Sequence, residues 1–247
     1  MRTIKTNQIM CVHCLDIIES ENTHDFKRCS CKAVAVDGGL DYLKRLSKSE
    51  NDYIELSETI FDEVNKVFCI CGYSSSGKDS ITNIVSKELN IPTLVSHTTR
   101  PMRDNEVNGE TYHFISDTEF KANENNFLEQ RHYDTVYGTW RYGLHSSEII
   151  NKPYSLFIVD RQGIEELSKV IGEDKIVSIF IEVSEEELKR RQALRGDSVE
   201  EFKRRIKFDI NRFKGFISDY IVYNDDLDIA VQNVKNIIVD EMSEECI

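Results

Sequence analysis

Short runs of apolar residues recur along the chain from residue 67 onward. They occupy residues 67–71, 93–95, 155–159, 176–181 and 220–222. Between them lie stretches with helical spacing, most clearly at residues 185–195, 199–213 and 227–242. Continuous apolar runs that alternate with helical stretches are typical of buried parallel strands joined by crossover helices. The pattern therefore predicts an α/β domain built on a parallel sheet.

The chain before residue 67 has a different character. Residues 1–46 are polar and rich in cysteine. The charged stretch at 44–65 has apolar residues at helical spacing, which we interpret as a connecting helix or linker. A chain of 247 residues holds one full α/β domain and a small appendage. We predict a cysteine-rich module at 1–46, a linker or helix at 47–66 and the α/β domain at 67–247.

Charge and hydropathy narrow the classes of partner. The formal net charge is −13, and an acidic surface argues against non-specific binding to nucleic acid. Local clusters of arginine and lysine still allow phosphate ligands. No apolar run is long enough for a membrane span, and no apolar segment of a secretory signal follows the charged first residues. We expect a cytoplasmic protein with no nucleic-acid or membrane partner.

A glycine-rich loop follows the first apolar run. Residues 72–78 read GYSSSGK, which is the G-x-x-x-x-G-K form between a predicted strand and a predicted helix. The glycines let successive N–H groups point into one concavity, and the helix N-terminus adds its positive dipole end. Lys78 would reach the β and γ phosphates of a nucleotide. Asp79 follows where Ser or Thr usually binds Mg²⁺, so that role passes to Ser80 or falls to Asp79. The alternative is a Ser/Gly-rich loop without a ligand.

A second basic segment lies downstream. Residues 95–103 read VSHTTRPMR, and residues 106–114 read EVNGETYHF. Arg100 and Arg103, three apart, can both face one phosphate, because the guanidinium fork matches phosphate oxygens. The hydroxyl of Tyr112 supplies another donor. The alternative is a solvated basic turn.

This stretch resembles the GMP-binding segment of guanylate kinases, S-x-T-T-R-x-x-R-x-x-E-x-x-G-x-x-Y-x-F. The resemblance continues through about residues 67–242. It includes FLE at 127–129, YGT at 137–139, DRQG at 160–163, the stretch from Arg191 to RG at 195–196, and NDDL at 224–227. It implies a P-loop three-layer parallel sheet of guanylate-kinase type, a mixed GMP-binding subdomain and a helical lid. It also implies transfer of the γ-phosphoryl group of ATP, with Mg²⁺, to GMP or dGMP.

The resemblance assigns roles by position. The ATP-binding residues would be Gly72, Ser74, Ser75, Ser76, Gly77, Lys78, Asp79, Ser80 and Asn224. The GMP-binding residues would be Ser96, Arg100, Arg103, Tyr112, Glu129, Tyr137, Thr139 and Asp160. Glu129 would accept from guanine N1 and N2, since an ionised carboxylate offers two acceptor oxygens. The catalytic cations would be Lys78 and the lid residues Arg191, Arg195 and Arg205.

Some positions depart from the family pattern. Tyr73 replaces a proline, Ser75 a glycine, and Ile158 the first of two aspartates. The segment from Glu129 to Tyr137 is about one residue short. The ending GKDS resembles ribose 1,5-bisphosphate phosphokinases, which we keep as a minor alternative beside another dNMP acceptor. A further alternative is an inactive interaction module with this fold. An active enzyme is favoured over this module, because the chain keeps the lysine and arginines of the family pattern: Lys78, Arg100, Arg103, Arg191 and Arg195.

Four cysteines gather near the N-terminus: Cys11, Cys14, Cys29 and Cys31. Two close pairs, separated by 14 residues, can supply a tetrahedral thiolate site. The spacing resembles zinc ribbons, and the segment is similar to small zinc-ribbon modules of bacteria and their phages with no known activity. We predict structural Zn²⁺, with four free or redox-active thiols as the alternative. The protein partner of the module is unknown.

Overall fold

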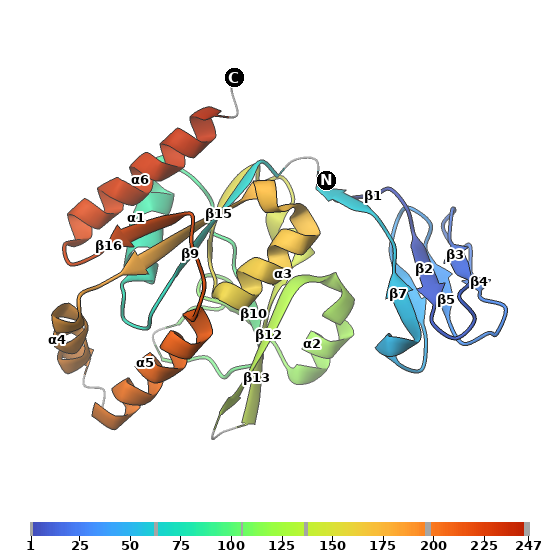
Figure 1. The fold of residues 1–247 in the computed structure, drawn as a ribbon, viewed down its shortest axis with the longest axis horizontal. Coiled ribbons are helices and arrows are strands. Elements are labelled where there is room, and N and C mark those ends of the chain that lie inside the picture. The colour runs from blue at the N-terminus through green and yellow to red at the C-terminus, as the bar shows by residue number, and fades with distance from the viewer. Residues whose placement is uncertain (1, 62–63, 105, 136–137, 196–198, 245–247) are drawn as a thin grey trace. The chain divides into compact units, whose positions relative to one another are not determined.

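The structure is a computed structural model that describes residues 2–61, 64–104, 106–135, 138–195 and 199–244. The chain divides into two units, Met1–Glu63 and Val64–Ile247. Each unit has its own sheets and its own core. Figure 1 colours the chain by residue number, from blue at the N-terminus to red at the C-terminus. Among the described residues, every helix is too short or too polar to cross a bilayer.

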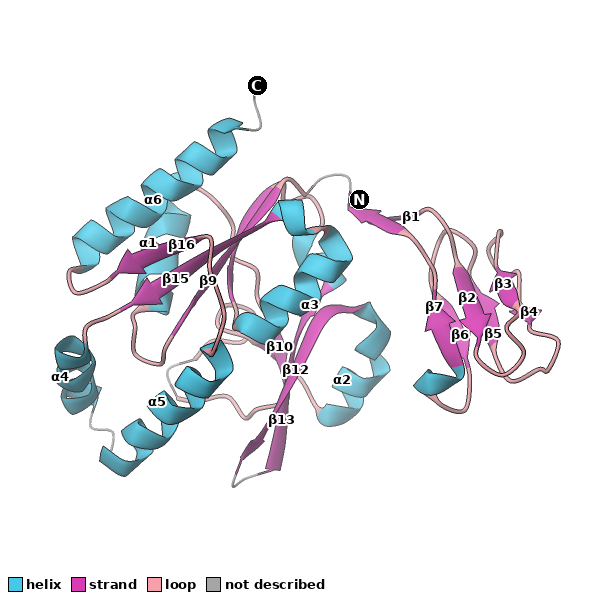
Figure 2. Ribbon diagram, viewed as in Figure 1, coloured by secondary structure: helices cyan, strands magenta, loops and turns pink. Residues whose placement is uncertain are grey.

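A four-stranded parallel sheet forms the centre of the second unit (Figure 2). Its order is β14 (Tyr154–Ile158), β9 (Lys66–Gly72), β15 (Ile176–Glu182) and β16 (Tyr220–Tyr223). Four of the five predicted strands are therefore confirmed. The fifth run, 93–95, forms only an isolated bridge from Thr93 to Leu156. The preceding Pro92 has no N–H to donate, so it contributes only its carbonyl, which accepts from the amide of Leu156.

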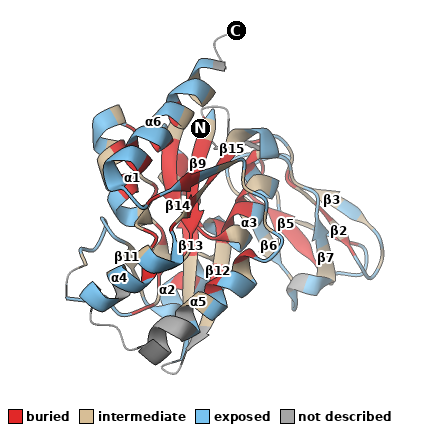
Figure 3. Cartoon of the chain, turned by 60° about the vertical axis from the view of Figure 1, so that its left-hand side comes forward, coloured by how far each residue is buried: buried red, intermediate tan, exposed pale blue. Residues whose placement is uncertain are grey.

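Helices cover both faces of this sheet. Alternate residues of β9 point to opposite faces, and Phe68 and Ile70 pack against α1 (Lys78–Leu89) and α6 (Leu227–Glu244) in one apolar cluster. Helix α3 (Arg161–Ile171) contacts β15 and a second sheet, which gives the predicted three-layer arrangement. Figure 3 shows the burial concentrated along the central strands. The α/β fold with its parallel sheet is confirmed.

The second sheet of this unit is mixed, as predicted. Its order is β11 (His113–Phe114), β10 (His97–Thr98), β13 (Gly138–His145) and β12 (Phe127–Thr135), with β10 parallel to β11 and the other pairs antiparallel. Helix α2 (Asp117–Ala122) begins with a capping box between Ser116 and Glu119. Helices α4 (Glu185–Arg195) and α5 (Val199–Phe213) occupy the segment predicted as the lid.

The first unit consists of short strands in three small sheets. The pairs are β1 (Arg2–Ile4) with β8 (Thr59–Phe61), β2 (Gln8–Cys11) with β3 (Ile17–Glu19) and β7 (Tyr53–Glu55), and β5 (Ala35–Asp37) with β4 (Lys27–Arg28) and β6 (Lys44–Leu46). The helical interpretation of 44–65 is wrong. The backbone of this stretch pairs with β1, β2 and β5, and its apolar residues Ile54 and Leu56 are exposed instead of forming one buried face.

Candidate active site

The glycine-rich loop connects β9 to α1, as its motif requires. Gly77 caps the helix with φ of +89°, a left-handed conformation that favours glycine. A Cβ at this position would lie 2.3 Å from Nδ2 of Asn224. Nζ of Lys78 donates to the carbonyls of Gly72 at 2.9 Å and Tyr73 at 2.8 Å, and burial lowers the pKa of Lys78. The lysine is therefore held folded back over the loop.

A carboxylate on α5 accepts a hydrogen bond from one backbone amide of the loop. The N–H of Ser74 donates to Oδ2 of Asp209 at 2.6 Å, and Asp209 is buried. Backbone amides of such a loop are anion-binding groups. Asp209 therefore holds a position that suits an anionic ligand, and none of the sequence motifs pointed to it.

A cavity of about 510 Å³ lies on one side of the loop. It is lined by Ser75, Gly77, Lys78, Asp79, Ser80, Arg190, Arg191, Leu194, Asn224 and Leu227. Arg191 donates to the carbonyl of Ser76 at 3.1 Å and to that of Asn224 at 2.5 Å. Oδ1 of Asn224 and Oγ of Ser76 are buried without a hydrogen-bond partner among the described residues. Most of the predicted ATP-binding residues thus meet in one cavity.

A second cavity, of about 230 Å³, lies on the other side of the loop. Its lining includes six of the predicted residues: Gly72, Ser74, Lys78, Ser96, Tyr112 and Asp160. Tyr133, Tyr142, Arg131, Asp209 and Arg212 also line it, beside Ile158, Val159 and Phe213. Lys78 lines both cavities, so its position joins the two candidate substrate sites.

The predicted acceptor-phosphate residues are arranged around a buried ion pair. Arg100 forms a bidentate pair with Glu106, at 2.6 Å and 2.9 Å, and it is buried. Its guanidinium lies 5.4 Å from the ring centre of Tyr112. Arg103 is exposed, and its backbone N–H donates to Glu106 at 2.8 Å. Of these residues, only Tyr112 lines the second cavity.

Strand β12 places three polar side chains at alternate positions. Glu129 is fully buried, and its pKa is raised to about 7 by burial, which outweighs the lowering by Arg131. Nη2 of Arg131 donates to Oε1 of Glu129 at 3.0 Å. Tyr133 donates from its hydroxyl to Oδ2 of Asp160 at 2.6 Å. Residues two apart on a strand share a face, so the alternation from Glu129 was the signal that could have found Arg131 and Tyr133.

Asp160 is the centre of a charged network at the end of β14. Its Oδ1 accepts the N–H of Gly163 at 3.1 Å and so caps α3. Arg212 of α5 pairs with Oδ2 at 2.9 Å, and its guanidinium lies 4.3 Å from the ring centre of Tyr133. The pKa of Asp160 is lowered by the charges of Arg131 and Arg212 and by these hydrogen bonds, against the effect of burial. The network connects the lid helix to the acceptor side.

The remaining predicted site residues are Thr139, Tyr137, Arg195 and Arg205. Thr139 is exposed on β13 and lines neither cavity. Tyr137 lies outside the described residues, as do the side chains of Arg195 and Arg205. The missed residues Asp209 and Arg212 are three apart on α5, a spacing that places two side chains on one helix face.

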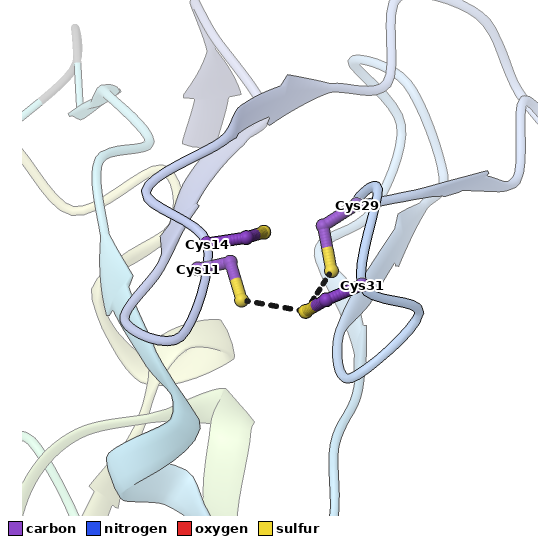
Figure 4. A group of neighbouring side chains, drawn as sticks. All are labelled: Cys11, Cys14, Cys29 and Cys31. Atoms are coloured by element: carbon purple, nitrogen blue, oxygen red, sulfur yellow. Dashed lines mark hydrogen bonds between the residues drawn. The ribbon is translucent and has the colours of Figure 1, made fainter.

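The four predicted cysteines of the first unit do come together (Figure 4). Their sulfur atoms all lie within 4.8 Å of one another, with 3.6 Å between Cys11 and Cys31 and 3.5 Å between Cys29 and Cys31. Tetrahedral Zn–S bonds of about 2.3 Å would place sulfurs at about 3.8 Å, so the donor set fits Zn²⁺. Backbone hydrogen bonds from Asp16 and Cys31 lower the pKa of Cys14 to about 6, which favours the thiolate.

The turns that carry these cysteines are alike. Leu15 and Lys32 follow the second cysteine of each pair, and both have left-handed φ of 61°. The N–H of Leu15 donates to the carbonyl of Cys11, and the N–H of Lys32 donates to that of Cys29. His13 is engaged with Asp52 at 3.0 Å, outside the cluster. Each turn therefore presents two sulfurs on one side.

Comparisons with known proteins agree with this geometry. A model of the guanylate kinase family matches residues 64–241, and a model described as a domain of unknown function (DUF7695) matches residues 3–47. The chain is 38% identical over 184 residues to the guanylate kinase of Zymomonas mobilis, which covers 71% of this chain and 83% of that protein. It is 33% identical over 181 residues to the guanylate kinase of a Shewanella strain, MR-7, covering 70% and 86%. The crystal structure of guanylate kinase from Anaplasma phagocytophilum superposes with a TM-score of 0.54 and 26% identity over 72% of this chain and 86% of that one.

Proposed function

The chain belongs to the guanylate kinase family, and on that premise we propose that it transfers the γ-phosphoryl group of ATP to GMP or dGMP, giving ADP and GDP or dGDP. The position of Lys78 carries the proposal. Its side chain lines both the cavity beside Asn224 and the cavity beside Ser96 and Tyr112. Phosphoryl transfer needs the attacking and leaving oxygens in line and cations that stabilise the charge on the transferring group.

In this reaction the protein must position the two substrates and stabilise the charge on the transferring phosphoryl group. An oxygen of the acceptor phosphate attacks the γ-phosphorus of ATP, and the bond from that phosphorus to the bridging oxygen breaks, leaving its electron pair on ADP. Lys78 and Arg191, which both line the donor cavity, are proposed to stabilise the charge on the transferring group, and the lid residues Arg195 and Arg205 are proposed to join them. Mg²⁺ bound with ATP would neutralise phosphate charge, and the oxygens of Asp79 and Ser80 in the donor cavity are the hard ligands that would hold it.

We assign the acceptor phosphate to Arg100, Arg103 and Tyr112, with Tyr137 assisting. We assign the base to the side of the acceptor cavity lined by Ser96, with Glu129 and Thr139 as further proposed contacts. Asn224 stays the proposed group at the adenine side. Binding of acceptor must compete with Glu106 for the fork of Arg100, because that fork is filled by a bidentate carboxylate. The predicted cytoplasmic location and the absence of a nucleic-acid partner stay predictions.

A coupled assay with ATP and Mg²⁺ tests the proposal. The acceptor panel should include GMP, dGMP, AMP, dTMP and ribose 1,5-bisphosphate, and we expect turnover with GMP or dGMP. Lys78→Met should abolish turnover, and Lys87→Met, an exposed lysine at the other end of α1, should not. No turnover with any acceptor would favour the interaction module, and turnover only with ribose 1,5-bisphosphate would favour the phosphokinase.

We also propose that Cys11, Cys14, Cys29 and Cys31 hold one structural Zn²⁺. The mutual approach of their sulfurs within 4.8 Å supports this. Elemental analysis of the purified chain should give about one zinc per chain. His13→Ala should keep that content, because His13 pairs with Asp52. A metal-free chain whose first unit is fully folded would contradict the assignment.

A further inference from the structure

Arg131 stands between the buried carboxylate of Glu129 and the acceptor cavity. The side chain of Glu129 is 0% exposed and does not line the cavity, whereas Arg131 lines it together with Ser96. An acceptor base in this cavity therefore meets a guanidinium before it can meet the carboxylate.

Arg131 has more hydrogen-bond donors than the protein uses. A guanidinium carries five N–H groups in a planar fork. Nη2 donates to Oε1 of Glu129 at 3.0 Å, and a second contact from Nη2 to Oγ of Ser96 is long, at 3.5 Å. Nη1 lies 3.8 Å from Oδ1 of Asp160, beyond hydrogen-bond distance. The end of the fork formed by Nη1 and Nη2 thus has donors left for a ligand.

Gly163 and Phe157 lie close to the pair of Arg131 and Glu129. Nε of Arg131 lies 2.7 Å from Oε2 of Glu129, although its N–H does not point at that oxygen. A Cβ on Gly163 of α3 would lie 3.0 Å from the same Oε2 and 3.3 Å from Cδ of Arg131. The guanidinium also lies 6.0 Å from the ring centre of Phe157. Glu129, Gly163 and Phe157 therefore limit the space in which the guanidinium can move.

We propose that Arg131 is the specificity-determining residue for the acceptor base, and that it reads two adjacent acceptor atoms, O6 and N7 of guanine, while Glu129 acts as its positioning residue. This rests on the proposed function of the same site. An arginine fork pairs with O6 and N7 of guanine because both atoms are acceptors on one edge. Adenine offers a donor, N6, beside N7, so the fork rejects it. Direct pairing of Glu129 with guanine N1 and N2 is the competing arrangement.

Acceptor analogues separate the two arrangements on the unmodified full chain. IMP keeps O6 and N7 but lacks the 2-amino group, and 7-deaza-GMP keeps the 2-amino group but lacks N7. We expect kcat/KM for IMP within about threefold of that for GMP, and a loss of about 5- to 150-fold with 7-deaza-GMP, the range for one bidentate arginine–guanine contact. Rejection of IMP by more than about 100-fold, with normal use of 7-deaza-GMP, would overturn the proposal, because unpaired buried acceptors discriminate that strongly.

A variant gives a second readout. Arg131→Lys keeps a positive charge beside Glu129 but removes the planar fork. The preference for GMP over 7-deaza-GMP should fall to about one in this variant, and an unchanged preference would contradict the role of Arg131. Arg141→Lys, on the neighbouring strand and paired with Asp117 at 2.9 Å, is the matched control and should keep the preference. Turnover with GMP but not with IMP overturns this inference alone, whereas no turnover with any acceptor overturns the proposed function as well.

Discussion

Removal of zinc from the first unit should unfold that unit. Its apolar core contains three buried aliphatic side chains, Ile9, Val34 and Val36, together with the buried sulfurs of Cys11 and Cys29. Burial of three such side chains stabilises by about 5–9 kcal/mol, at roughly 1.5–3 kcal/mol each. Zinc held by four thiolates contributes about 10–16 kcal/mol. Bound zinc would therefore stabilise this unit more than the burial of these three side chains does.

Hydrogen exchange read by mass spectrometry measures this directly. The chain is treated with a chelator under reducing conditions, and the exchange of amides in β2 and β5 is compared with that of the untreated chain. Loss of zinc should remove the protection of both strands, and added Zn²⁺ should restore it. His13→Ala should behave like the unmodified chain. Equal protection in β2 and β5 with and without chelator would refute the reasoning.

Three further predictions concern the second unit. Gly77→Ala should lower turnover at least tenfold, because its Cβ would clash with the side chain of Asn224. The control is Gly109→Ala, which has a similar φ of +85° but open space around it. That variant should carry only the backbone strain of about 1–2 kcal/mol and keep its turnover. Asp209→Asn should tighten ATP binding about fivefold or more, measured by calorimetry, because a carboxylate beside the triphosphate repels it. Asp228→Asn, on the exposed first turn of α6, is the control and should leave ATP binding unchanged. The pKa of Glu129, raised by burial from 4.5 to about 7, means that the folded state keeps a proton that the unfolded state releases. The unfolding free energy should therefore decline as the pH rises from 4.5 to 7, and urea midpoints of Glu129→Gln should lack that part of the decline.

The apolar runs of the second unit predicted most of its central sheet. Strands such as β9 are buried on both faces over nearly their whole length. Residues 67–72 are all buried and none is charged, so the apolar run is visible without knowledge of its neighbours. The glycine-rich loop could also be located from the sequence, because the left-handed conformation at Gly77 favours glycine at that position.

The first unit was harder to predict. Its strands are two to four residues long, and three residues are too few to show alternation. The charged stretch at 44–65 matched helical spacing by coincidence. Its position in the fold is set by the pairing of β7 with β2 and of β8 with β1, contacts that join residues far apart in the sequence.

The motifs located the site but not its internal pairing. They predicted Glu129 and Asp160 as acceptor residues, whereas the structure pairs the first with Arg131 and the second with Tyr133 and Arg212. These partners come from positions between the motifs and from a lid helix, so their approach depends on tertiary packing.

Transfer of radioactive phosphate tests the central claim most directly. The chain is incubated with ATP labelled with ³²P at the γ position, Mg²⁺ and GMP, and the products are separated by chromatography. We predict that the label appears at the β phosphate of GDP, and that this product is absent with Lys78→Met. Label found only in inorganic phosphate, or retained entirely in ATP with both GMP and dGMP, would contradict direct transfer between two nucleotides that meet at Lys78.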